Sequence, residues 1–203
     1  MKKLTLVMVL MVAGIICWQT MEAYGQAGAG QQRGVQQVDA AAVVAFLNQQ
    51  GMAAEAKALE ALQKDPAKEA EYQALLMQYN TVMREMERDP AAGKLSVEKM
   101  KCGAAIALVL PKAKAGDAAA RTSLTTEVGK LFDVIIAQQE ALAAAEELAQ
   151  SPGEQQRTGR GRGLTDAQKA ELKVNIELWK KNKAAIVKAR VDELLLPYPR
   201  LPW

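Results

Sequence analysis

The side chains that could do covalent or metal chemistry are few in this sequence. It has no histidine and only two cysteines, which excludes Ser-His-Asp and Cys-His nucleophile systems and the histidine-containing zinc and copper sites. Carboxylate pairs such as Glu146-Glu147 lie in a repetitive Ala/Glu stretch, where we expect a solvated helix surface rather than acid–base catalysis. We therefore predict no catalytic residue, no metal site and no cofactor, and we expect a non-enzymatic binding protein.

Cys102 is the one cysteine outside the N-terminal apolar run, so the rest of the chain cannot form an intramolecular disulfide. Apolar residues follow it up to Ile106, which favours a small buried core residue. A reactive thiol is the alternative interpretation, but the chain has no histidine that could activate it.

Basic side chains are concentrated near the C-terminal end. The whole chain has a net charge of +3, whereas the segment from Arg157 to Arg190 holds ten Lys/Arg and three Asp/Glu, a net +7. This basic segment begins inside a predicted Gly/Arg loop at 154–163, which contains RTGRGRG. This loop is either a charged, solvated linker or a contact for anionic envelope polymers, lipid head groups or acidic proteins. We predict partner-binding residues among its basic and aromatic neighbours, namely Arg157, Arg160, Arg162, Lys169, Lys173, Trp179, Lys180, Lys181 and Trp203.

Good helix formers dominate, and no stretch alternates as a strand would. We predict an all-α fold, an antiparallel bundle of five or six helices within residues 38–196. Asp39 caps the first helix, which ends before Gly51, and a second helix covers 52–64. The following helices are expected at 65–88, 96–110, 117–150 and 165–196. Ser96 should open the fourth, whose apolar residues 103–110 suggest a central core helix that Pro111 stops.

The longest predicted helix, 117–150, carries an a/d heptad pattern. The positions are Leu124, Val128, Leu131, Ile135, Gln138, Leu142, Ala145 and Ala149. Such a seam indicates a helix that packs along a partner helix. An intramolecular antiparallel bundle is favoured over an intermolecular coiled coil, because Gln138 and the two alanines weaken the seam.

The N-terminus has the order of a secretory signal peptide, predicted as residues 1–25. Lys2 and Lys3 precede an apolar run, and Ala23-Tyr24-Gly25 offers a cleavage site. The run of about 15 residues is shorter than the roughly 17–25 that span a bilayer. An uncleaved anchor and a lipoprotein at Cys17 are the alternatives. We expect a periplasmic or secreted protein, which argues against nucleic acid as a partner.

Two further segments flank the helical domain. Residues 26–37 are rich in Gln and Gly and are predicted to form a flexible leader. Residues 197–203, PYPRLPW, predict an extended Pro-rich tail. This tail either packs on the bundle through Trp203 or serves as a ligand for another protein.

The residues Leu164-Thr165-Asp166-Ala167-Gln168 form a predicted capping box, with Thr165 as the N-cap and Gln168 three residues later. Any helix start could use this arrangement. The five residues also resemble the LTxxQ motif of the Spy/CpxP-like periplasmic helical proteins, over about 30 residues from Leu164 onward. A second such motif is incomplete, since Leu95 to Lys99 has Lys in place of Gln. The resemblance implies an exported all-helical protein, a homodimer, and ATP-independent binding of unfolded proteins or a role in envelope stress.

The last predicted helix combines an apolar sector with lysines. The sector comprises Leu172, Ile176, Trp179, Ile186, Val187, Val191 and Leu194. It either binds partly unfolded clients together with the lysines, or it faces the bundle core while the lysines are solvated. The leading functional hypothesis is an exported chaperone or envelope-stress protein. The alternative is a structural or adaptor protein that docks on a fixed envelope partner.

Overall fold

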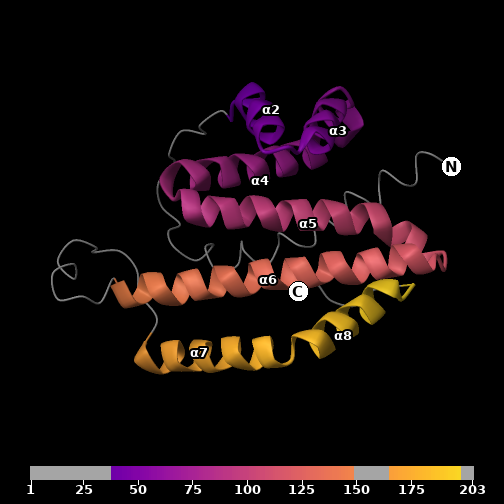
Figure 1. Ribbon diagram of the computed structural model, residues 1–203. Coiled ribbons are helices and arrows are strands. Elements are labelled where there is room, and N and C mark those ends of the chain that lie inside the picture. The colour runs from indigo at the N-terminus through magenta and orange to yellow at the C-terminus, as the bar shows by residue number, and fades with distance from the viewer. Residues whose placement is uncertain (1–37, 149–164, 198–203) are drawn as a thin grey trace. The chain divides into compact units, whose positions relative to one another are not determined.

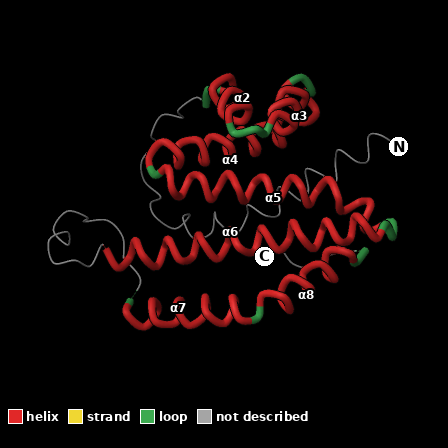
Figure 2. Tube along the Cα trace, viewed as in Figure 1, coloured by secondary structure: helices red, strands yellow, loops and turns green. Residues whose placement is uncertain are grey.

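The structure, a computed structural model, describes residues 38–148 and 165–197. The predicted signal peptide 1–25, the leader 26–37, the Gly/Arg loop 154–163 and residues 198–203 of the tail lie outside the described residues. The described part consists of helices and turns, with no strand, which confirms the all-α prediction (Figure 2). Its helices, labelled in Figure 1, are α2 Ala40–Gln49, α3 Ala53–Gln63, the 3-10 turn η1 Pro66–Lys68, α4 Glu69–Arg88, α5 Pro90–Lys114, α6 Ala118–Leu148, α7 Asp166–Lys181 and α8 Lys183–Leu195.

Aspartates begin several of these helices, as side-chain acceptors for backbone N–H groups that have no helical partner. Asp39 Oδ1 accepts from the backbone N–H groups of Ala41 and Ala42 at 3.0 and 3.2 Å. Glycines end two of them: Gly51 after α2 and Gly116 after α5 have φ angles of 74° and 95°. The predicted cap at Asp39 and the predicted stop at Gly51 are confirmed.

Helix α5 differs from its prediction at both ends. It begins at Pro90 rather than Ser96, because Asp89 Oδ1 accepts from the N–H groups of Ala91 and Ala92 at 3.1 Å and proline suits the first helical position. It also continues through Pro111 to Lys114. The proline removes one hydrogen bond close to the helix end, where the basic residues of the last turn complement the dipole.

The segment 103–110 of α5 is not buried all round, contrary to its prediction. Ile106 and Leu110 are buried, but Leu108 is 67% exposed. Cys102 is buried, as the core interpretation of that cysteine expected.

The chain divides into two compact units, and the division falls inside α5, after Ala107. In the described part of the first unit, α2, α3 and α4 pack on one another (Figure 1). Their shared core includes Val43, Leu47 and Leu59, each at most 1% exposed. Gly93 of α5 lies directly against the Met86 backbone of α4, so these two helices approach closely there.

In the described part of the second unit, α6 contacts both α7 and α8, which run back along it in the opposite direction (Figure 1). Leu124, Val128 and Leu131 are buried, as the heptad seam predicts. Beyond them the seam is less buried, because Ile135 is half-buried and Leu142 is 45% exposed. Leu142 follows Leu124 by 18 residues, which is five turns of about 3.6 residues, so it lies on the same side of α6. There it lines a shallow pocket together with Leu172 of α7.

The predicted helix 165–196 is broken at Asn182 into α7 and α8, which is why seven α-helices are described rather than five or six. Asn182 has φ −102° and ψ 11°, outside the helical range. Its side-chain amide donates to the Leu178 carbonyl at 2.8 Å, and its backbone N–H donates to the same oxygen at 3.0 Å. Asparagine favours such local bonds over helix continuation.

Among the described helices, none combines the length and the apolar character that crossing a membrane requires.

Candidate functional site

The structure places the predicted binding residues in different environments. Arg157, Arg160, Arg162 and Trp203 lie outside the described residues, as does Leu164 of the cap motif. Lys169 is buried at 8% exposure and Trp179 is half-buried. Lys173, Lys180 and Lys181 are exposed on α7. The described candidates for contact with a partner are therefore these three lysines.

The capping box at the start of α7 is formed as predicted. The Thr165 hydroxyl oxygen accepts from the Gln168 backbone N–H at 3.3 Å, and Gln168 Oε1 accepts from the Thr165 backbone N–H at 2.9 Å. Asp166 lies in the first turn, where it complements the helix dipole. These contacts give Thr165 and Gln168 a local structural role, whereas the family resemblance stays a prediction.

The apolar sector of the last predicted helix lies toward the interior of the second unit. Ile176, Val187, Val191 and Leu194 are buried. Leu172, Trp179 and Ile186 are half-buried. This arrangement fits the interpretation of the sector as bundle core.

A different apolar face of α7 is open to solvent, and the sequence reasoning missed it. Val174 and Leu178 are 58% and 49% exposed. They are four residues apart, and Lys181 follows three residues later, so the three side chains share one side of the helix. We call Val174, Leu178 and Lys181 the mixed face. The i, i+4 spacing of the two apolar residues was a signal that could have found it.

A groove of about 540 Å³ lies between α6 and the junction of α7 and α8. Its lining combines lysines with small side chains. The lining residues are Thr125, Thr126, Gly129, Lys130, Asp133, Lys180, Lys181, Lys183, Ala184 and Val187. We call it the lysine groove. The break at Asn182 separates Lys180 and Lys181 of α7 from Lys183 of α8, and all three line this groove.

Ion pairs hold most of the groove lysines. Lys183 Nζ contacts both Asp133 oxygens at 2.6 and 2.7 Å, which links α8 to α6. Lys180 Nζ lies 2.6 Å from Glu140 Oε1 of α6 and 3.2 Å from Glu177 Oε1. These pairs are solvent-exposed, so each is worth roughly 0–1 kcal/mol.

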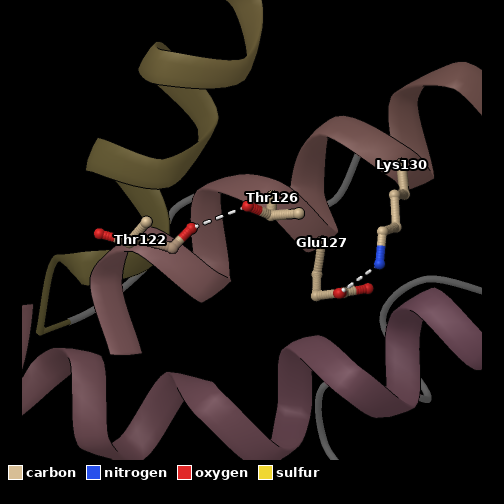
Figure 3. A network of polar contacts seen from close by, with 4 residues as sticks. All are labelled: Thr122, Thr126, Glu127 and Lys130. Atoms are coloured by element: carbon tan, nitrogen blue, oxygen red, sulfur yellow. Dashed lines mark hydrogen bonds and ion pairs between the residues drawn. The ribbon is translucent and has the colours of Figure 1, made fainter. Parts of the chain in front are cut away.

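The remaining groove lysines differ in their pairing. Lys130 Nζ pairs with Glu127 Oε1 at 2.7 Å (Figure 3). Lys181 makes no ion pair with a described residue. It is thus the groove cation that is open to a carboxylate from outside.

The α6 side of the groove is less polar than its sequence implies. The Thr125 and Thr126 hydroxyls donate to the carbonyls of Arg121 and Thr122 at 3.0 and 3.1 Å, the second of which Figure 3 shows. Their hydroxyl protons are thereby used within the helix. Gly129 beside them presents bare backbone, and a Cβ built there would meet no described atom within 4 Å.

The Lys180 contacts predict a measurable titration. The hydrogen bonds that Lys180 donates to Glu140 and Glu177 raise the pKa of Lys180 above 10.5. A raised pKa means that the pairs stabilise the fold at neutral pH, and that this contribution is lost only as the pH rises through the folded pKa, above 10.5. We expect Glu140→Gln to lower the pKa of Lys180 toward 10.5, as measured by NMR of the lysine side chain.

Lys188 is the control for this titration. Asp192 raises its pKa through a separate hydrogen bond, so its pKa should not change in Glu140→Gln. An unchanged pKa of Lys180 in that variant would contradict the cross-helix pair.

Over the described ranges, no three or more His, Cys, Asp or Glu side chains come together in a group that could hold a metal ion. No family model matches the chain, and neither a curated protein nor a solved structure is significantly similar to it.

Proposed function

We propose that this chain is an exported, non-enzymatic helical binding protein that acts as an ATP-independent chaperone for partly unfolded proteins in the periplasm or outside the cell. The export part rests on the signal-peptide pattern at 1–25, and the chaperone part is in line with the resemblance of Leu164–Gln168 to the Spy/CpxP-like motif. The lack of histidine and of a catalytic motif supports a binding role.

The mixed face of α7 is the observation that supports this function best. A chaperone without ATP must hold many different clients weakly, which requires exposed apolar contact beside charge rather than a closed pocket. Val174 and Leu178 supply exposed apolar surface, and on the same side of the helix Lys181 supplies a cation that pairs with no described residue. Long-range attraction then captures acidic clients, and the apolar side chains contact what the client exposes.

This mechanism predicts that the double variant Val174→Gln/Leu178→Gln suppresses aggregation less well. Burial of exposed valine and leucine surface against a client contributes about 1–2 kcal/mol in total, which corresponds to roughly tenfold in affinity. Glutamine is a good helix former, so α7 should stay folded. The measurement is light scattering of an acidic client, unfolded by reduction of its disulfides, across a range of salt concentrations.

The matched control is Met77→Gln/Leu108→Gln, which removes two exposed apolar side chains elsewhere. It should suppress aggregation like the wild type. Equal losses in both double variants would show that the mixed face is not the client surface. Suppression of no client by the wild type, together with one stoichiometric partner in a pull-down, would instead favour an envelope adaptor.

A further inference from the structure

Gly129 has no structural reason to be glycine within the described chain. It lies in the interior of α6, where glycine costs roughly 1 kcal/mol relative to alanine. An added Cβ would meet nothing within 4 Å, so neither a neighbouring helix nor an unusual φ angle requires it. Its backbone lines the lysine groove. A glycine there leaves space for another chain to approach α6 closely.

Among the charges around this space, Lys181 is the one that points to an acidic occupant, because the described carboxylates at the groove pair with the other lysines. Four lysines and one aspartate line the lysine groove. Glu140 and Glu177 pair with Lys180 through exposed contacts, which an incoming carboxylate can replace at little cost. Glu127, which pairs with Lys130, is only 20% exposed. Lys181 needs no such exchange, since it makes no ion pair with a described residue.

The same charges argue against a second copy of this chain. In a two-fold interface the same patch of each copy faces the other. In an interface centred on Gly129 the described carboxylates of each groove already pair with lysines of their own chain, so a second copy brings Lys181 no unpaired carboxylate from this patch.

A lipid surface fits the groove less well than a polypeptide. Lipid phosphates would contact the lysine ammonium groups, but a flat headgroup layer would leave Gly129, Ala184 and Val187 uncovered. A polypeptide with small side chains can reach this lining with its main chain and still present carboxylates to the lysines.

We propose that the lysine groove binds a short acidic segment of a client polypeptide, with small side chains packed over Gly129 and carboxylates paired with Lys181 and its neighbours. This inference rests on the proposed function and adds a specific acidic-segment site to the mixed face.

The test uses the full chain and a fluorescein-labelled peptide of alternating glutamate and alanine, measured by fluorescence anisotropy. We expect binding that weakens with salt and is absent for the matching lysine–alanine peptide. Gly129→Leu should remove binding by filling the groove, and leucine stabilises a helix relative to glycine, so folding is retained. Lys181→Glu should weaken binding by about tenfold.

The control is Lys101→Glu, an exposed mid-helix lysine of α5 outside the groove, which changes net charge equally. It should bind within about twofold of the wild type. Unchanged peptide binding by Gly129→Leu would overturn the proposal. So would a wild type that binds phosphatidylglycerol vesicles but not the peptide.

Aggregation suppression by the same proteins separates the two proposals. If the wild type suppresses aggregation but does not bind the peptide, the groove proposal is wrong and the chaperone function stands. If it binds the peptide in a Gly129-dependent way and suppresses no aggregation, the groove stands and the chaperone function is wrong.

Discussion

Gly93→Ala is expected to destabilise the first unit by about 2–4 kcal/mol. A Cβ at position 93 would lie 2.4 Å from the Cα, 2.6 Å from the N and 2.8 Å from the Cβ of Met86. Two of these atoms are backbone, so no rotamer change can relieve the overlap. The helices α4 and α5 must separate at this contact, and separation loses packing around Met86, which borders the core of the unit. Urea unfolding followed by circular dichroism measures the loss.

The matched control makes the same substitution at Gly129 within α6, where an added Cβ would have no described atom within 4 Å. Gly129→Ala should stabilise the protein by about 0.5–1 kcal/mol, since alanine restricts the unfolded chain and favours the helix. Hydrogen exchange should locate the first change in α4 and the second in α6. Equal effects of the two variants would contradict the close approach at Gly93.

Leu124→Ala should cost about 2–5 kcal/mol. The Leu124 side chain is 0% exposed, at the first position of the heptad seam in α6. Truncation removes its transfer free energy and leaves a cavity that the packed helices only partly fill. The fall in unfolding free energy, from urea titration, tests this value.

Leu142→Ala is the control on the same helix and in the same heptad seam. Because Leu142 is 45% exposed, we expect a loss of less than about 1 kcal/mol. Similar losses at 124 and 142 would mean that the heptad seam is buried along its whole length, contrary to the structure.

The helix caps and helix ends could be predicted from the sequence, because they depend on residues only a few positions apart. Asp39 caps α2, Gly51 ends it, and Thr165 with Gln168 closes the capping box of α7. Each depends on hydrogen bonds or φ angles between near neighbours. The predicted start at Ser96 and stop at Pro111 were wrong because proline breaks a helix only where its missing hydrogen bond matters, and near both ends of α5 that cost is small.

Only part of the candidate site could be predicted from the sequence. The concentration of lysines toward the C-terminal end is a property of the sequence, but the grouping of Lys180, Lys181 and Lys183 with Lys130 depends on α7 and α8 folding back along α6. The apolar sector of the last predicted helix contains more residues, yet Ile176, Val187, Val191 and Leu194 are buried in the interior of the second unit. The exposed pair Val174 and Leu178 has the same helical spacing, so periodicity alone could not say which face meets solvent.

The sequence by itself determined that this protein is all-α, where most of its helices begin and end, and that histidine-dependent chemistry is excluded. These properties follow from composition and from contacts between residues close in the chain. Only the tertiary structure decided which apolar face of α7 is open, where the heptad seam leaves the core, and that Gly93 is packed against backbone while Gly129 is bare within a groove. Burial of a helix face depends on which partner helix packs against it, and that choice is made by the whole fold.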